Sequence, residues 1–253
     1  MSVYRFKKAA VLGAGVMGAQ IAAHLANAGV PVVLFDLPAD GKDKNAIVNK
    51  ALANLGKLSP SPLASKALVN NIQAGNYDEH LALLADCDVI IEAIAERLDW
   101  KKSLYAKILP FVGPKAILAS NTSGLSINAL SEVLDESLHH RFCGLHFFNP
   151  PRYMHLVELI PCASTDTDVL VSLETFLVST LGKGVVYAKD TPNFIGNRIG
   201  VFSILSILHH TEQFKMGFDE VDALTGPLIG RPKSATYRTC DVVGLDTMGH
   251  VIN

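Results

Sequence analysis

A histidine and a carboxylate, each inside its own apolar run, are the most informative pair of residues. His146 lies in GLHFF and Glu158 lies in LVELI, with the breaker NPP between them. The two runs are predicted to be short strands that can lie side by side and bring Glu158 within reach of His146. A histidine held by a carboxylate in an apolar setting is typical of a general base. An isolated core histidine would more simply bond a backbone carbonyl, but neighbouring Asn149 and a nucleotide-binding motif upstream favour the catalytic interpretation.

That motif is a glycine-rich turn between a strand and a helix. The short strand at 9–12 runs directly into Gly-Ala-Gly-Val-Met-Gly, and helical periodicity follows over 20–28, with Gly29 as its stop. Gly13 permits the tight turn, Gly15 admits a pyrophosphate, and Gly18 lets the helix pack closely on the strand. The helix N-terminus offers N–H groups to phosphates. Asp36 closes the next strand, where a carboxylate binds ribose hydroxyls and repels a 2′-phosphate, which favours NAD over NADP. The cofactor-binding residues predicted here are Gly13, Gly15, Val16, Met17, Gly18 and Asp36.

Two polar segments follow the next buried strands. One is EAIAE at 92–96 with Lys101 beyond it, and the other is SNTS at 120–123, which contains Asn121. Open α/β sheets bind ligands at the carboxyl ends of their strands, so both segments are candidate site segments. The simpler interpretation of Ser, Asn and Thr is that they cap a following helix, predicted here at 127–134.

Strands and helices alternate along the chain. This alternation predicts an α/β fold with a Rossmann-like, doubly wound, mostly parallel sheet. A helical insertion at about 40–86, which looks like a helical hairpin, interrupts it. The predicted strands are 9–12, 32–35, 87–92, 115–120, 144–148, 156–160 and 184–187, and the predicted helices of this part are 20–28, 45–55, 64–72, 99–111, 127–134 and 166–181.

The last part of the chain is predicted to be helical. Asp190 or Thr191 can cap a helix that has Pro192 in its first turn and continues to Gly217. This helix is apolar nearly all round, so we expect it to be buried in a domain or subunit interface. The predicted domains are 1–189, which binds the dinucleotide, and 190–253, the beginning of an all-α C-terminal domain.

Composition excludes several classes of protein. The chain of 253 residues is 49% hydrophobic and carries 22 basic against 24 acidic residues, so it is globular and shows no basic bias toward nucleic acid. Four scattered cysteines without paired spacing indicate reduced, buried thiols rather than a zinc site or disulfides. We find no signal peptide, no apolar run long enough to span a membrane and no convincing metal-ligand cluster, so we expect a cytoplasmic protein without a metal.

Taken together, several blocks resemble the 3-hydroxyacyl-CoA dehydrogenases. The blocks are VLGAGVMGAQIA, EAIAERLDWKK, SNTSGLSI, GLHFFNPPRYMHLVELIP, KDTPNFIGNR and DVVGLD. They occur in the family's order through almost the whole chain, which is more specific than any single motif. The resemblance implies NAD-dependent oxidation of a (3S)-3-hydroxyacyl-CoA to the 3-ketoacyl-CoA in fatty-acid β-oxidation.

The resemblance also implies roles for particular residues. His146 matches the catalytic base and Glu158 its carboxylate partner. Ser123 matches the hydroxyl that binds the substrate oxygen, Asn197 helps to hold substrate near the base, and Asn149 orients groups in the same pocket. Glu96 and Lys101 match positions that contact the nicotinamide half of NAD, and Asn121 is placed with the cofactor-binding residues.

Two departures from the family pattern concern the larger protein. Single-function members have Gly where this chain has Asn193, and a Val-Pro pair where it has Pro151-Arg152, so the chain looks closer to long members fused to an enoyl-CoA hydratase-like module. Asn253 falls inside the C-terminal domain that closes the active site and forms a homodimer, so we expect a fragment of a larger protein. The alternatives are a dehydrogenase of a free hydroxy acid or sugar acid, or a non-catalytic NAD-binding fragment.

Overall fold

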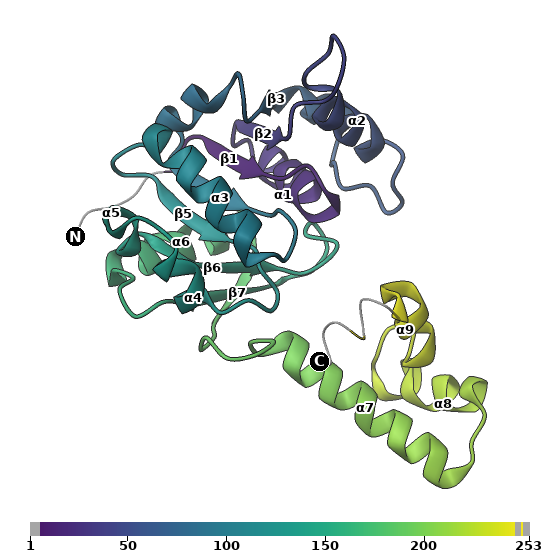
Figure 1. Ribbon diagram of the computed structural model, residues 1–253. Coiled ribbons are helices and arrows are strands. Elements are labelled where there is room, and N and C mark those ends of the chain that lie inside the picture. Colours follow the sequence, from purple (N-terminus) through teal and green to yellow (C-terminus); the bar gives the residue numbers. More distant parts are fainter. Residues whose placement is uncertain (1–5, 246–248, 250–253) are drawn as a thin grey trace. The chain divides into compact units, whose positions relative to one another are not determined.

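The computed structural model describes residues 6–245 and residue 249. The chain divides into two compact units, Met1–Thr191 and Pro192–Asn253. The first unit contains the sheet, and the second consists of helices and loops (Figure 1). Positions 246–248 and 250–253 of the predicted C-terminal domain lie outside the described residues.

One eight-stranded sheet forms the centre of the first unit. Its strands are β1 (Ala9–Leu12), β2 (Val32–Asp36), β3 (Ile72–Asn76), β4 (Val89–Glu92), β5 (Ile117–Ser120), β6 (Phe142–Phe147), β7 (Leu156–Pro161) and β8 (Gly184–Tyr187). The spatial order is β3-β2-β1-β4-β5-β6-β7-β8. Neighbours from β3 to β6 are parallel, whereas β7 runs antiparallel to β6 and β8 runs parallel to β7. The order reverses between β1 and β4, which is where doubly wound sheets bind ligands. The predicted α/β fold is confirmed.

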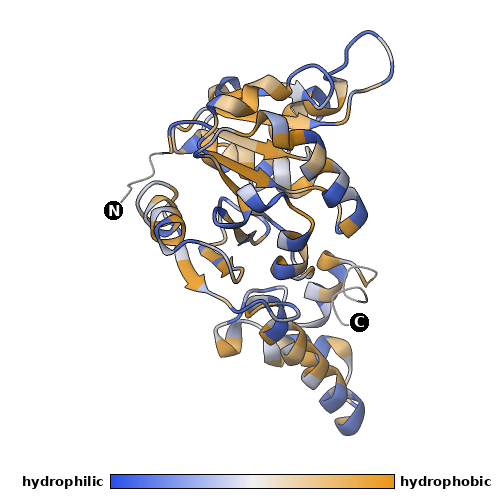
Figure 2. Cartoon of the chain, turned by 60° about the vertical axis from the view of Figure 1, so that its left-hand side comes forward, coloured by the Kyte–Doolittle hydropathy of each residue, from blue (hydrophilic) through white to orange (hydrophobic). Residues whose placement is uncertain are grey.

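The central strands are apolar because both of their faces are covered, as is usual for parallel sheets. Val11 and Leu34 face helices α1 (Val16–Asn27), α2 (Ala46–Leu55) and α6 (Thr167–Ser179), which share one buried cluster with them. On the opposite face, Tyr105 of α3 (Leu98–Ile108) packs edge-on against Phe142, with ring centroids 6.2 Å apart. Figure 2 shows the strands as the most hydrophobic part of this unit. Helices therefore pack on both faces of the sheet and hold the ends of its strands in place.

Shorter helices complete the first unit. Helix α4 (Ile127–Glu132) follows β5 and packs against Gly144, where an added Cβ would lie 2.7 Å from Ile127 Cδ1. The other short helices are α5 (Glu136–His139) and the 3-10 helices Lys66–Asn71, Leu81–Asp86 and Leu109–Phe111.

The segment between β2 and β4 differs from its prediction. The helix predicted at 45–55 is confirmed as α2, but the helix predicted at 64–72 is wrong, and so is the helical hairpin. The chain forms a 3-10 helix there and then the edge strand β3, which pairs in register with β2 from Val32–Ile72 to Asp36–Asn76. Gly75 lies against the Phe35 ring, where a Cβ would approach Phe35 Cε1 to 3.0 Å. Backbone pairing with β2 therefore decides the structure of this polar segment.

The second unit contains three helices among its described residues. They are α7 (Gly196–Phe214), α8 (Phe218–Thr225) and α9 (Tyr237–Val243), with a 3-10 turn at Pro227–Ile229. The predicted start of α7 at Pro192 is wrong, because Asn193 and Phe194 take left-handed backbone conformations (φ 62° and 46°), so the helix begins at Gly196. Phe202 of this helix is 73% exposed, and the expected burial of the helix in a domain or subunit interface stays a prediction.

The remaining sequence predictions concern cysteines and membrane spans. All four cysteines are free and buried, as predicted. Within the described ranges, no helix has the length and apolar character required to cross a bilayer.

Candidate active site

The predicted contact between His146 and Glu158 is present. The two residues are directly opposite each other in the β6–β7 ladder, and His146 Nδ1 lies 2.7 Å from Glu158 Oε2. Only 4% of His146 is exposed, and Glu158 is fully buried. The Phe148 ring lies 4.5 Å from the imidazole, centroid to centroid. A carboxylate in this position fixes the ring orientation and stabilises the imidazolium that forms when the ring takes a proton.

Asn149 lies directly after β6 and is held from the cofactor side of the sheet. Its Oδ1 accepts a hydrogen bond from Gln20 Nε2 of α1 at 3.2 Å. The buried Lys183 ammonium donates hydrogen bonds to the carbonyls of Pro151 and Met154 in the same connection. The β6–β7 connection is therefore anchored to α1 and to the segment that precedes β8.

The glycine-rich turn has the geometry that a dinucleotide requires. Gly13 has φ +105° and no room for a side chain, since a Cβ would lie 2.7 Å from the Ala93 carbonyl oxygen. A Cβ on Gly18 would lie 1.8 Å from the Gly13 carbonyl oxygen, so this glycine is required for close helix–strand packing. A Cβ on Gly15, in contrast, would meet nothing within 4 Å. The structure thus leaves space at Gly15, where the motif predicts a pyrophosphate.

Helix α1 begins at Val16, immediately after that space. Val16 is 69% exposed, whereas Met17 is half-buried against the core. The first N–H groups of a helix have no partner within the helix and carry the positive end of its dipole. The start of α1 therefore fits the phosphates of NAD, as the glycine-rich motif predicts.

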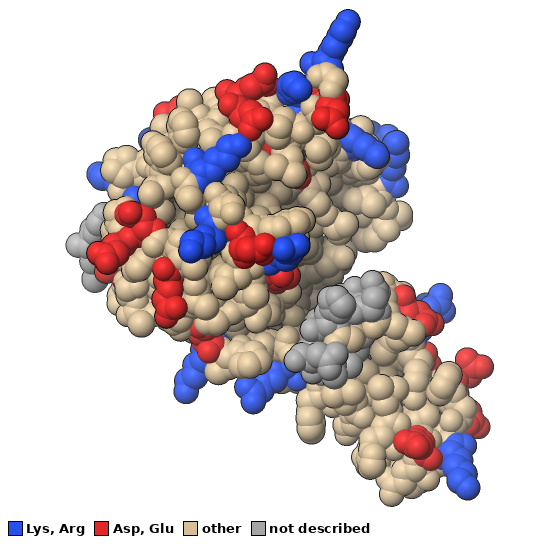
Figure 3. Space-filling model, in the orientation of Figure 1, with Lys and Arg blue, Asp and Glu red and all other residues tan. Residues whose placement is uncertain are grey.

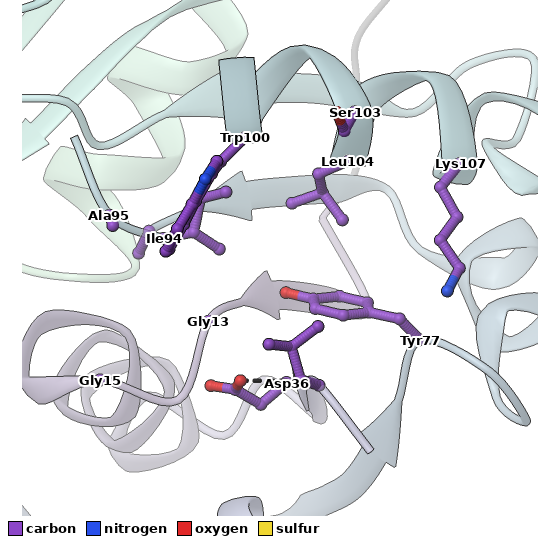
Figure 4. Close-up of a pocket in the computed structure, with 12 residues that line it drawn as sticks. Gly13, Gly15, Asp36, Tyr77, Ile94, Ala95, Trp100, Ser103, Leu104 and Lys107 are labelled. Carbon is purple, nitrogen blue, oxygen red and sulfur yellow. Dashed lines mark hydrogen bonds between the residues drawn. The ribbon is translucent and has the colours of Figure 1, made fainter. Parts of the chain in front are cut away.

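Asp36, at the end of β2, braces the turn. Its Oδ2 accepts a hydrogen bond from the Ala14 N–H at 2.6 Å, and its Oδ1 accepts one from Leu37 N–H at 2.7 Å. The residue also lines a cavity together with Gly13 and Gly15 (Figure 4). This position beside the turn is the one from which an acidic side chain can reach a ribose.

Glu96 connects the two predicted polar segments. Its carboxylate accepts hydrogen bonds from Thr122 Oγ1 at 2.7 Å and from the backbone N–H and the hydroxyl of Ser123, the latter at 2.9 Å. Asn121 Oδ1 in turn accepts a hydrogen bond from Phe147 N–H at 2.9 Å, which ties the end of β5 to β6. Ser123 is thereby held by Glu96, while Asn121, two residues earlier, is joined to the strand that carries His146.

Lys101, which was predicted to contact the cofactor, is buried against two glutamates. It is fully buried, and its Nζ lies 2.6 Å from Glu92 Oε1 and 3.7 Å from Glu96 Oε2. Glu92, which is also fully buried, accepts further hydrogen bonds from Ile94 N–H, Tyr105 OH and Ser120 Oγ at 2.7–2.9 Å. The sequence placed Glu92 in a candidate site segment, but it did not predict that four groups would gather around this buried carboxylate.

Asn197 belongs to the second unit. It lies in the first turn of α7 and is half-buried. Its predicted contact with substrate stays a prediction.

The surface charge is mixed, and the described residues show no cluster of metal ligands. Figure 3 shows basic and acidic side chains interspersed on one face of the molecule. Across residues 6–245 and 249, no group of three or more His, Cys, Asp and Glu side chains is placed to hold a metal ion.

Comparison with known proteins gives one consistent result. Residues 8–191 match the family model of the 3-hydroxyacyl-CoA dehydrogenase NAD-binding domain. A Deinococcus radiodurans protein, named as a probable 3-hydroxyacyl-CoA dehydrogenase, is 46% identical over 98% of this chain and 72% of its own length. A Rickettsia felis protein, named "Putative fatty acid oxidation complex trifunctional enzyme", is 42% identical over 96% of this chain, which spans 34% of that protein. The crystal structure of (S)-3-hydroxybutyryl-CoA dehydrogenase from Ralstonia eutropha is 30% identical with a TM-score of 0.82, over 98% of this chain and 86% of the other.

Proposed function

Since this chain belongs to the 3-hydroxyacyl-CoA dehydrogenase family and carries its NAD-binding domain, we propose that it oxidises a (3S)-3-hydroxyacyl-CoA to the 3-ketoacyl-CoA with His146 as the base. The observation that carries the proposal is the buried 2.7 Å contact between His146 Nδ1 and Glu158 Oε2. The names of the relatives and the Ralstonia structure support the class of substrate.

His146, Glu158 and Ser123 have separate roles in the proposed reaction. NAD, when bound, supplies the hydride acceptor. His146 takes the hydroxyl proton at Nε2, because Nδ1 faces Glu158. Glu158 stabilises the imidazolium, and the hydroxyl of Ser123 positions the substrate oxygen. Acid–base assistance of this kind contributes roughly 10²- to 10⁴-fold.

The NAD-binding region and the C-terminal region have separate proposed roles. Residues 1–189 bind NAD through the glycine-rich turn and Asp36, with Glu96 and Lys101 on the nicotinamide side. Residues 190–253 contribute Asn197 to the substrate and form a homodimer contact, which the exposed Ile199 and Phe202 of α7 support. An enoyl-CoA hydratase-like module is either fused to this dehydrogenase or associates with it. The Rickettsia relative, whose name calls it trifunctional, supports this assignment.

Turnover by the purified chain tests the proposal. NADH formation is followed with 3-hydroxybutyryl-CoA, a longer 3-hydroxyacyl-CoA and free 3-hydroxybutyrate. We expect both thioesters to react, and His146→Gln to lose at least about a hundredfold in kcat while still binding NAD in calorimetry. The exposed His140 offers a matched control, His140→Gln, which should behave as the wild type. Unchanged turnover by His146→Gln would refute the assignment of the base, and preference for the free acid would refute the assignment of the substrate.

A further inference from the structure

A buried amide side chain interrupts the apolar sequence of α1. Gln20 is only 7% exposed, and its buried neighbours Ala19 and Ile21 are apolar. The glycine-rich motif accounts for its three glycines but makes no demand on position 20. Since a buried amide is unfavourable unless it is hydrogen-bonded, the partner of Gln20 indicates what this residue does.

Asn149 is that partner, although it lies 129 residues away in the sequence. Gln20 Nε2 donates a hydrogen bond to Asn149 Oδ1 at 3.2 Å. An asparagine amide has one end that accepts and one end that only donates, so a donor placed at Oδ1 decides which way the group is turned. Asn149 is exposed, and its Nδ2 bonds no acceptor among the residues that the structure describes. The contact with α1 therefore leaves an amide donor open to a ligand.

The backbone around Asn149 is held independently of Gln20. The buried Lys183 ammonium binds two carbonyls of the connection just beyond Asn149. On the other side, the ring of Phe148 lies against the imidazole of His146, with centroids 4.5 Å apart. The contact with Gln20 therefore orients the Asn149 side chain rather than the backbone that carries it, and this side chain follows the base closely in the chain.

The proposed substrate has two oxygens near its reacting carbon. The 3-hydroxyl is assigned to His146 and Ser123, whereas the thioester carbonyl still requires a donor. A carbonyl oxygen can only accept hydrogen bonds, so it fits an amide N–H and is repelled by an amide oxygen. The direction of the Asn149 amide would thus decide whether this residue attracts or repels the thioester.

We propose that Gln20 is a positioning residue: it holds the Asn149 amide with Nδ2 turned away from α1, so that Nδ2 donates a hydrogen bond to the thioester carbonyl of the bound substrate. The inference rests on the proposed function and on the place that the family resemblance gives Asn149 in the pocket of His146. The helix whose first turn faces the phosphates of NAD would then also orient a substrate-binding group.

Replacing Gln20 by Glu reverses the amide without removing the contact. An ionised carboxylate only accepts, so Asn149 must turn Nδ2 toward α1 and its oxygen toward the substrate. We expect Gln20→Glu to weaken acetoacetyl-CoA binding in calorimetry by about five- to fiftyfold, and to raise the KM for 3-hydroxybutyryl-CoA more than it lowers kcat. Lowering the pH should restore the binding relative to the wild type, because a protonated Glu donates to Oδ1 as Gln20 does.

Further variants separate orientation from stability. Gln20→Met suits the apolar surroundings and releases the amide, so the loss of acetoacetyl-CoA binding should be smaller, about two- to fivefold, and equal at every pH. In an Asn149→Ala background, Gln20→Met should have no further effect, because Gln20 acts through Asn149. Gln73→Glu is the matched control, since it adds the same charge to the first unit at an exposed position of β3, and it should bind as the wild type does.

The outcomes distinguish this inference from the proposed function. If Gln20→Glu binds acetoacetyl-CoA as tightly as the wild type, or if its loss is the same at every pH, the inference is overturned and the dehydrogenase proposal stands. If Gln20→Glu does not fold, unchanged binding by Gln20→Met overturns it, and so does an undiminished loss in the Asn149→Ala background. If the wild-type chain neither binds acetoacetyl-CoA nor forms NADH, the proposed function and this inference fail together.

Discussion

Replacing Lys101 by Met tests whether this lysine is primarily a structural cation. The change retains most of the side-chain volume and removes the ammonium that lies 2.6 Å from Glu92 Oε1. Both groups are fully buried, so Glu92 would keep a negative charge that only neutral donors contact. Breaking one side of a buried pair costs about 3–5 kcal/mol. For a domain of this size that corresponds to a fall of roughly 6–20 °C in Tm.

The same helix provides the control. Lys107 pairs with Asp78 at the same type of distance, 2.7 Å, but its side chain is 45% exposed. An exposed pair contributes about 0–1 kcal/mol, so Lys107→Met should hardly change the stability. The double variant Glu92→Gln/Lys101→Met removes both charges and should recover a large part of the loss.

Chemical denaturation and calorimetry of NAD binding form the assay. If Lys101→Met unfolds within about 1 kcal/mol of the wild type, the argument from burial is refuted. If, in addition, its affinity for NAD falls, Lys101 acts mainly on the cofactor, as the sequence resemblance implied.

Three further predictions concern other parts of the first unit. Burial, and then the charge of Lys183, lower the pKa of His24 from 6.5 to about 4, so the unfolded chain binds this proton more readily than the folded one. The unfolding free energy should therefore fall by up to about 3 kcal/mol between pH 6.5 and 4, and the fall should largely vanish in His24→Gln when urea melts are compared at both ends of that range. Gly15→Ala should keep the wild-type Tm but weaken NAD binding by roughly tenfold, whereas Gly18→Ala should cost about 1–3 kcal/mol or more in stability; equal Tm values for the two variants would contradict this. Asp190→Ala should destabilise the unit by about 1–3 kcal/mol, because the Asp190 carboxylate accepts hydrogen bonds from Ile127 N–H and from the Ser126 and Asn128 side chains; an unchanged urea midpoint would count against that role.

Periodicity and motifs predicted the centre of this fold from the sequence. Strands buried on both faces, such as Ala9–Leu12 and Ile117–Ser120, follow from local apolar runs. The glycine-rich turn follows from glycines at positions where backbone geometry leaves no room for a side chain. The pairing of His146 with Glu158 was also predictable, because a short connection and alternation along two strands determine it.

What sequence reasoning missed depends on contacts between distant segments. IQAGN becomes β3 because β2 offers it an open edge, which nothing in those five residues reveals. Asp190 or Thr191 was expected to cap the helix that follows, yet Asp190 accepts hydrogen bonds from the start of α4, more than sixty residues earlier in the sequence. The burial of Lys101 likewise depends on packing that the spacing of residues does not encode.

The register of β6 and β7 has a consequence for how this protein can change. The ladder from Cys143–Pro161 to Phe147–Val157 places His146 opposite Glu158, and a slip of one residue would turn either side chain to the other face. The contact between His146 and Glu158 is therefore encoded in the backbone pairing of two strands and not in the connection between them. Substitutions in that connection that leave Phe148 and Asn149 in place and keep the carbonyls of Pro151 and Met154 on Lys183 should accumulate without separating the pair.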